Sequence, residues 1–174
     1  GYEYAIDISG AYASEKFAEE FTYAGDDLGA TWSEKNTAFR VWAPTAECVS
    51  VNLYLSGTQG TDDLIKSVPM VKDVNGTWVV TVEGDLNGTY YTYAVTVGGK
   101  TVEAVDPYAR TTGVNGQRGM VIDLDSTDPE GWAEDTNPNP ITSYTDAVIY
   151  ELHVRDFSID SSSGILEDYM GKFL

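Results

Sequence analysis

The fold is decided by residues 49–56, Val-Ser-Val-Asn-Leu-Tyr-Leu-Ser. The apolar side chains of Val49, Val51, Leu53 and Leu55 take every second position in this stretch. Successive side chains of a β-strand point to opposite faces, so this period of two predicts a strand with one buried face. The same pattern returns further along the chain, where Trp, Val and Val stand at positions 78, 80 and 82.

Turn signals separate this strand from others like it. Asn-Gly or Gly-Gly dipeptides stand at 75–76, 87–88, 98–99 and 115–116, and they tolerate the positive φ that tight turns require. Strands at a spacing of about ten residues, divided by such turns, predict a mainly β fold, an immunoglobulin-like β-sandwich over residues 28–124. The expected strands lie near residues 37–43, 48–56, 67–72, 77–83, 89–97, 100–105 and 118–124.

Residues 1–27 are interpreted as an N-terminal lead-in with a short helix. Ser14 is a suitable N-cap for a helix that runs to about residue 23. Phe17 and Phe21 stand four residues apart and therefore share one face of this helix. Two aromatic side chains on one helix need a surface to cover, so we expect the helix to pack on the segment that follows.

Residues 125–145 predict a linker, because they are polar and contain Pro129, Pro138 and Pro140 without apolar periodicity. After the linker, residues 146–174 are expected to form ordered structure again. Residues 147–154 are mostly apolar and predict a strand that is buried on both faces, as in a parallel sheet. Such a strand needs neighbours on both sides, and no later segment supplies them. We therefore expect residues 146–174 to be the truncated start of a second domain.

The composition excludes several kinds of partner. The chain has 174 residues, with 10 basic and 28 acidic side chains and a net charge of −18. Nucleic acids and anionic membrane surfaces bind basic patches, so we expect neither as a partner. No apolar run is long enough to span a membrane, and no signal-peptide pattern opens the chain. Cys48 is the only cysteine, which excludes a disulfide within the chain.

Several short motifs, taken in order, resemble a known family. Residues 27–32, 37–46, 76–78, 88–93 and 105–109 are similar to the successive landmarks of carbohydrate-binding modules of family 48. Residues 147–158 resemble the first barrel strand of glycoside hydrolase family 13, in which such a module often precedes the catalytic barrel. The combination is most similar to the type I pullulanases.

This resemblance implies an activity for a longer parent protein. The parent would hydrolyse α-1,6-glucosidic linkages in pullulan and branched starch, with two carboxyl groups held about 5–5.5 Å apart. In that family these groups follow later barrel strands, so no catalytic residue is assigned here and we expect this chain to be inactive alone. The sandwich would support a (β/α)8 barrel. Its partners would be the remainder of the barrel and an α-glucan such as pullulan, starch or glycogen.

Sugar binding by a sandwich requires exposed aromatic rings that lie flat on pyranose rings. The candidate residues are Trp42, Tyr54, Trp78 and Tyr91. Each has an alternative role in packing, because Trp78 and Tyr91 share strand faces with valines, and Trp42 lies beside Pro44. Glucan-binding members of the family carry a tryptophan shortly before the Asp-Pro motif, whereas residues 98–105 contain no aromatic residue.

We expect neither a cofactor nor a metal ion. Acidic residues near position 125 have a spacing similar to a calcium loop, but Asp128 occupies the position that requires glycine. His153, the only histidine, has no nucleophile at a recognisable spacing, and we interpret it as structural. The alternative function is a stand-alone immunoglobulin-like binding or adhesion module. We expect a location outside a bacterial cell or on its surface, with the cytoplasm as the alternative.

Overall fold

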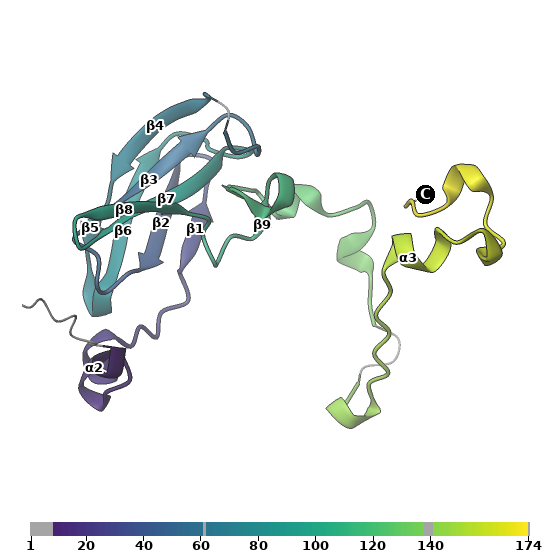
Figure 1. Cartoon of the computed structure of the whole chain (residues 1–174), viewed down its shortest axis with the longest axis horizontal. Helices are drawn as coiled ribbons and strands as arrows, with labels where there is room; N and C mark the ends of the chain where they lie inside the picture. Colours follow the sequence, from purple (N-terminus) through teal and green to yellow (C-terminus); the bar gives the residue numbers. More distant parts are fainter. Residues whose placement is uncertain (1–8, 61, 138–140, 174) are drawn as a thin grey trace, which may run out of the picture. The chain divides into compact units, whose positions relative to one another are not determined.

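The computed structural model describes residues 9–60, 62–137 and 141–173 (Figure 1). The chain divides into two compact units, residues 1–128 and residues 129–174. Two predicted segments lie partly outside the described residues. These are the lead-in, at its start, and the linker, at Pro138 and Pro140. Leu174 also lies outside them. The predicted division into lead-in, sandwich, linker and barrel start stays a prediction.

Two antiparallel sheets form the first unit, which confirms the mainly β fold (Figure 1). One sheet has the strand order β1 (Gly29–Trp32), β2 (Asn36–Trp42), β6 (Thr77–Glu83), β5 (Val71–Lys72). The other has the order β4 (Leu64–Pro69), β3 (Cys48–Tyr54), β7 (Tyr90–Val97), β10 (Gly119–Met120), β9 (Thr111–Thr112), and β8 (Lys100–Ala104) also pairs with β7.

The alternating stretch forms β3 as predicted, but the strand ends earlier. Val49, Val51 and Leu53 are buried between the sheets, and β3 pairs with β7 so that Leu53 lies opposite Tyr91. Leu55 was predicted on the same buried face, yet 73% of it is exposed. The pairing of β3 with β4 shifts register after Leu53, and this irregularity ends the alternation.

Other strand boundaries also differ from the predicted ones. The last predicted strand, near residues 118–124, is reduced to β10, which pairs with only two residues of β7 and of β9. Strand β1 was not predicted, because it is only four residues long and begins at Gly29 with a φ of 101°. A short run that starts with glycine carries little strand propensity, and β1 forms because β2 pairs with it along its whole length.

The predicted helix is present and packs on the sandwich. Helix α1 (Ser9–Tyr12) precedes α2 (Glu15–Phe21), and the Ser14 side chain caps α2 by accepting a hydrogen bond from the Phe17 N–H at 3.2 Å. The Asn75 Nδ2 donates to the carbonyl oxygen of Glu20 at 3.1 Å. The helix is therefore anchored to the turn before β6, which confirms the expectation that it covers a surface.

An ion-pair cluster around Arg40 holds the rest of the lead-in. The Arg40 Nε lies 2.8 Å from Asp27 Oδ2, and its Nη1 lies 2.6 Å from Asp73 Oδ2. The Tyr23 hydroxyl donates to Asp27, and this bond, with that of Arg40, holds the pKa of the Asp27 carboxyl below its usual range. Arg40 thus joins the lead-in to β2 and to the turn before β6.

The second unit contains short helices and no strand among its described residues. These are the 3₁₀ helices η4 (Trp132–Glu134), η5 (Tyr144–Asp146), η6 (Ser161–Ser163) and η7 (Glu167–Tyr169), with α3 (Val154–Ser158) between η5 and η6. The predicted linker, residues 125–145, therefore includes short helical turns. One further helical turn of this linker, η3 (Asp125–Thr127), lies in the first unit.

The predicted strand at residues 147–154 is not formed in this structure. Val148, Ile149 and Tyr150 are 96%, 90% and 77% exposed, and α3 begins at Val154. A strand requires a neighbour for its backbone hydrogen bonds, and the described residues of the second unit provide none. Across the described residues, no helix combines the length and apolar character that crossing a bilayer requires.

Candidate functional site

Three of the four predicted sugar-binding residues are buried in the sandwich. The exposed fractions are 0% for Tyr91, 5% for Trp78 and 7% for Tyr54. A ring that stacks on a sugar must offer one face to solvent, so these three do not form a platform. Trp42 is the exception, because 42% of its surface is exposed.

Tyr91 belongs to a buried cluster around Asp106. Its hydroxyl donates to Asp106 Oδ2 at 2.7 Å, and that of Tyr93 donates to the same oxygen at 3.4 Å. Burial raises the pKa of the Asp106 carboxyl, while hydrogen bonds from the Tyr108 N–H and the two tyrosines oppose the increase. The edge of the Tyr91 ring also meets the Phe39 ring, with centroids 5.1 Å apart. Tyr91 therefore stabilises the core.

Trp78 also packs inside the sandwich. Its Nε1 donates to the carbonyl oxygen of Ala43 at 3.0 Å, which fixes the connection between β2 and β3. The Lys72 Nζ lies 5.2 Å from the centroid of its ring, within the range of a cation–π contact. The side chain thus has a complete set of internal contacts and no ring face available for a ligand.

Tyr54 is covered by Arg118. The Arg118 Cζ lies 3.6 Å from the centroid of the Tyr54 ring, on the face that a sugar would need. The Tyr54 hydroxyl donates to Glu103, and Thr92 Oγ1 donates to the same carboxylate at 2.5 Å. Partial desolvation of the Glu103 carboxylate raises its pKa, but the hydrogen bonds from Thr92 and Tyr54 outweigh this effect and the pKa is lowered.

Arg118 itself was missed by the sequence analysis. It is 3% exposed, and its Nη1 lies 3.0 Å from both carboxylate oxygens of Asp63 and 2.7 Å from the Ser56 carbonyl oxygen. These partners are 55 and 62 residues away in sequence, so no local pattern could have revealed the cluster. Its contacts tie the β3–β4 connection to β10 and are structural.

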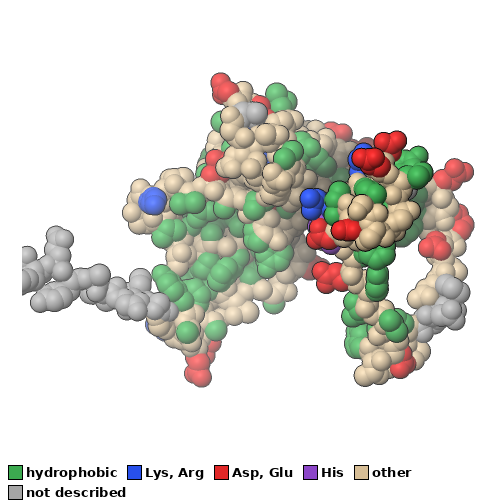
Figure 2. Space-filling view, turned by 45° about the vertical axis from the view of Figure 1, so that its right-hand side comes forward, with side chains coloured by type: hydrophobic (Ala, Val, Ile, Leu, Met, Phe, Trp, Pro, Cys, Tyr) green, Lys and Arg blue, Asp and Glu red, His purple; other side chains and the backbone are tan. Residues whose placement is uncertain are grey.

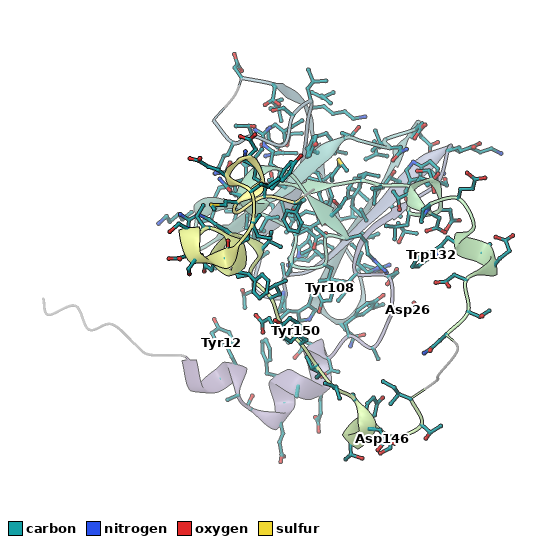
Figure 3. The ribbon with its side chains drawn as sticks, turned by 90° about the vertical axis from the view of Figure 1, so that its right-hand side faces the viewer. Tyr12, Asp26, Tyr108, Trp132, Asp146 and Tyr150 are labelled. Atoms are coloured by element: carbon teal, nitrogen blue, oxygen red, sulfur yellow. The ribbon has the colours of Figure 1, made fainter. Side chains whose placement is uncertain are left out.

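Trp42 forms the wall between two hollows beside α2. We call the larger one, of about 800 Å³, the Trp42 groove. It is lined by Phe17, Ala18, Phe21, Thr22, Tyr23, Leu28, Val41, Trp42, Pro107 and Tyr108. The smaller hollow, of about 480 Å³, lies between Trp42, Phe17 and Tyr12. Figure 3 labels Tyr12 on the helical lead-in and Tyr108 on the sandwich.

The position of Trp42 is fixed by its own hydrogen bonds. Its Nε1 donates to the carbonyl oxygens of Phe21 at 2.7 Å and of Asn75 at 3.1 Å. The Phe17 ring meets it edge-on, with centroids 6.4 Å apart. Trp42 is therefore a rigid aromatic side chain that is exposed to solvent. In the part of the chain that the structure describes, no three His, Cys, Asp or Glu side chains gather to hold a metal ion.

The sandwich matches a known family. Residues 27–109 match Carbohydrate-binding module 48 (Isoamylase N-terminal domain). This segment is similar to the module 48 family. The match begins and ends where the sequence motifs resembled this family, at Asp27 and Ala109, so the predicted resemblance is confirmed.

Pullulanases are similar to this chain well beyond the module. The pullulanase of Bacillus subtilis (strain 168) is 35% identical over 175 residues, which cover 100% of this chain and 22% of the relative. The chloroplastic pullulanase 1 of Arabidopsis thaliana is 36% identical, with coverage of 83% and 16%.

Solved structures agree with these relatives. A pullulanase from Paenibacillus barengoltzii, in complex with maltohexaose and alpha-cyclodextrin, is 52% identical with a TM-score of 0.77, over 91% of this chain and 24% of that chain. The pullulanase from Bacillus acidopullulyticus is 50% identical with a TM-score of 0.73, over 88% and 18%. Our chain thus resembles the module 48 region of pullulanases and spans about a quarter or less of their length.

Proposed function

We propose that this chain is the module-bearing part of a pullulanase that hydrolyses α-1,6-glucosidic linkages in pullulan and branched starch. The main support is the similarity to the Bacillus subtilis pullulanase, which covers the whole chain rather than residues 27–109 alone. A stand-alone binding module would account for the sandwich but not for the similarity of the second unit. The comparison therefore favours the pullulanase over the adhesion module.

Within such an enzyme, the sandwich acts mainly as a support for the catalytic barrel. Three of its four candidate aromatic residues stabilise its own structure, as their burial shows. The α-glucan is proposed as the partner of the whole protein. The structure of the Paenibacillus barengoltzii pullulanase in complex with maltohexaose supports this substrate class.

The activity of the longer protein provides the test. We expect the 174-residue chain to release no reducing ends from pullulan, because the family's two catalytic carboxyl groups follow later barrel strands. The longer protein that contains this chain should release them readily. Hydrolysis by the 174-residue chain, or none by the folded longer protein, would contradict the proposal.

Residues 146–158 are proposed to form the first strand of the barrel once neighbouring strands are present. Val148, Ile149 and Tyr150 carry large apolar surfaces that are almost fully exposed in this chain. Burial of each such side chain contributes about 1.5–3 kcal/mol, so neighbouring strands would strongly favour the extended, paired state.

Hydrogen exchange tests this strand. In the longer protein, we expect the backbone amides of residues 148–152 to exchange at least about a hundredfold more slowly than in the 174-residue chain, because a ladder would protect them. The amides of β3 serve as the control, since their hydrogen bonds exist in both proteins. Equally fast exchange at residues 148–152 in both would exclude the strand.

A further inference from the structure

Asn-Gly dipeptides stand in three turns of the first unit, at residues 75–76, 87–88 and 115–116. Asparagine is chemically labile, and a following glycine, which has no Cβ, leaves its backbone nitrogen open to the asparagine side chain. That nitrogen bonds to the side-chain carbon Cγ, ammonia leaves, and a succinimide ring closes. Water then opens the ring to aspartate or isoaspartate. The reaction consumes water, releases ammonia and needs no cofactor or oxidant.

The fold protects Asn75 from this reaction. Its Nδ2 donates to the carbonyl oxygen of Glu20 at 3.1 Å, and its own carbonyl oxygen accepts a hydrogen bond from the Trp42 Nε1 at 3.1 Å. Gly76 is crowded as well, because a Cβ built on it would lie 2.6 Å from Pro44 Cβ. The Asn75 side chain therefore reaches the Gly76 nitrogen only if α2 detaches from the sandwich.

The fold also protects Asn87, which lies in the turn between β6 and β7. Its Oδ1 accepts a hydrogen bond from the Asp123 N–H at 3.0 Å, and the Gly88 N–H donates to the carbonyl oxygen of Val121 at 2.9 Å. The segment 121–123 thus holds both of the groups that must react. Ring closure requires both hydrogen bonds to break, which raises its barrier.

Asn115 lies in the turn between β9 and β10 and has no such protection. Both Asn115 and Gly116 are exposed, and among the described residues the Asn115 side chain makes no hydrogen bond or ion pair. The Gly116 N–H donates only within its own turn, to the carbonyl oxygen of Gly113 at 3.2 Å. A Cβ built on Gly116 would meet no atom within 4 Å beyond its chain neighbours, so the turn has room to adjust.

The same turn is clamped to the β3–β4 connection. The Val114 N–H donates to the carbonyl oxygen of Gly57 at 3.1 Å, and the Gln59 N–H donates to Gln117 Oε1 at 3.0 Å. The two backbones also touch, because a Cβ built on Gly113 would lie 2.4 Å from Gly57 Cα. Isoaspartate inserts an extra carbon into the main chain, and a turn in such close contact with a second backbone has no slack to absorb it.

We propose that Asn115 is a site of spontaneous deamidation, and that its conversion to isoaspartate loosens the contact between residues 113–118 and the β3–β4 connection. This inference goes beyond the proposed function and does not depend on it. Figure 2 shows acidic side chains predominating over basic ones on the visible face, and the net charge is −18. The new carboxylate joins this acidic surface in contact with solvent, where a single charge contributes little. The main effect therefore comes from the lengthened backbone.

Mass spectrometry of the aged protein tests the site. The folded 174-residue chain is incubated at mildly alkaline pH, and peptide mapping measures aspartate and isoaspartate at the three positions. We expect Asn115 to react at least about tenfold faster than Asn75 or Asn87, since each of those must break two hydrogen bonds. In guanidinium chloride, where the fold is lost, the three positions should react at similar rates.

The variant Asn115→Gly separates the chemistry from its consequence. Glycine readily adopts the φ of 54° found at this position, so the variant should fold and carries no reactive amide there. After the same incubation, we expect the midpoint of urea denaturation to fall in the wild-type chain, in proportion to the isoaspartate at position 115. The midpoint of the variant should stay constant.

Two results would overturn the inference. One is conversion at Asn115 that is no faster than at Asn75 or Asn87 in the folded chain, which would show that the hydrogen bonds of those two residues give no protection. The other is full conversion at Asn115 with an unchanged midpoint, which would show that the turn accommodates the longer backbone. Pullulan hydrolysis by the longer protein is a separate measurement, so failure of the proposed function leaves this test unaffected.

Discussion

Replacing Tyr91 with alanine is expected to lower the free energy of unfolding of the sandwich by about 3–5 kcal/mol. Tyr91 is 0% exposed, and its removal leaves a cavity beside Phe39. It also removes the closest hydroxyl donor to Asp106, at 2.7 Å. Urea denaturation, followed by the intrinsic tryptophan fluorescence of the chain, measures the change.

Tyr91→Phe is the matched control, because it keeps the ring and removes only the hydroxyl. We expect it to cost about 1–3 kcal/mol, the range for a lost hydrogen bond to a buried charged group. If Tyr91→Ala instead left stability unchanged and weakened glucan binding, Tyr91 would be a sugar-binding residue and our assignment of it to the core would be wrong.

Replacing Arg118 with alanine is expected to destabilise the sandwich by about 3–5 kcal/mol, because it leaves a largely buried partner without its counter-charge. The side chains of Arg118 and Asp63 are only 4% and 13% exposed. The variant also uncovers the Tyr54 ring, which Arg118 contacts at 3.6 Å. The midpoint of urea denaturation at constant slope measures the loss.

Arg110→Ala is the control for Arg118→Ala, since Arg110 is exposed. A surface substitution of this kind should change stability by no more than about 0.5 kcal/mol. Equal, small effects of the two variants would show that the buried cluster around Arg118 contributes nothing to stability.

The sequence predicted those elements of the fold that depend on local pattern. The alternation at Val49, Val51 and Leu53 identifies β3, because one face of the strand packs on the opposite sheet. The cap at Ser14 identifies α2, because the capping hydrogen bond is local. Leu55 was misassigned because the register shift that exposes it depends on the pairing with β4, which lies further along the chain.

The candidate site was harder to predict, because burial of an aromatic ring depends on distant residues. Tyr54 faces away from the core-lining residues of β3, and Arg118, which lies far away in sequence, covers its ring. Trp42 stays exposed because α2 meets one side of its indole and leaves the groove beside it. Neither arrangement leaves a signal in the spacing of the residues, so the sequence indicated aromatic candidates without separating core from surface.

The strand predicted at residues 147–154 shows a different limit of sequence analysis. Its apolar pattern is clear, but a strand forms only where neighbouring strands are available. In this chain, Val148 and Ile149 are exposed and the segment is unpaired. The pattern therefore carries information about a larger domain, which we propose to be the pullulanase barrel.

The most direct test is a proton NMR spectrum of pullulan after incubation with the longer protein that contains this chain. The anomeric signals of α-1,6 and α-1,4 linkages are separate, so the linkage that is cleaved can be identified. Our account predicts that the α-1,6 signal disappears while the α-1,4 signal is retained. Loss of the α-1,4 signal with the α-1,6 signal intact would contradict it.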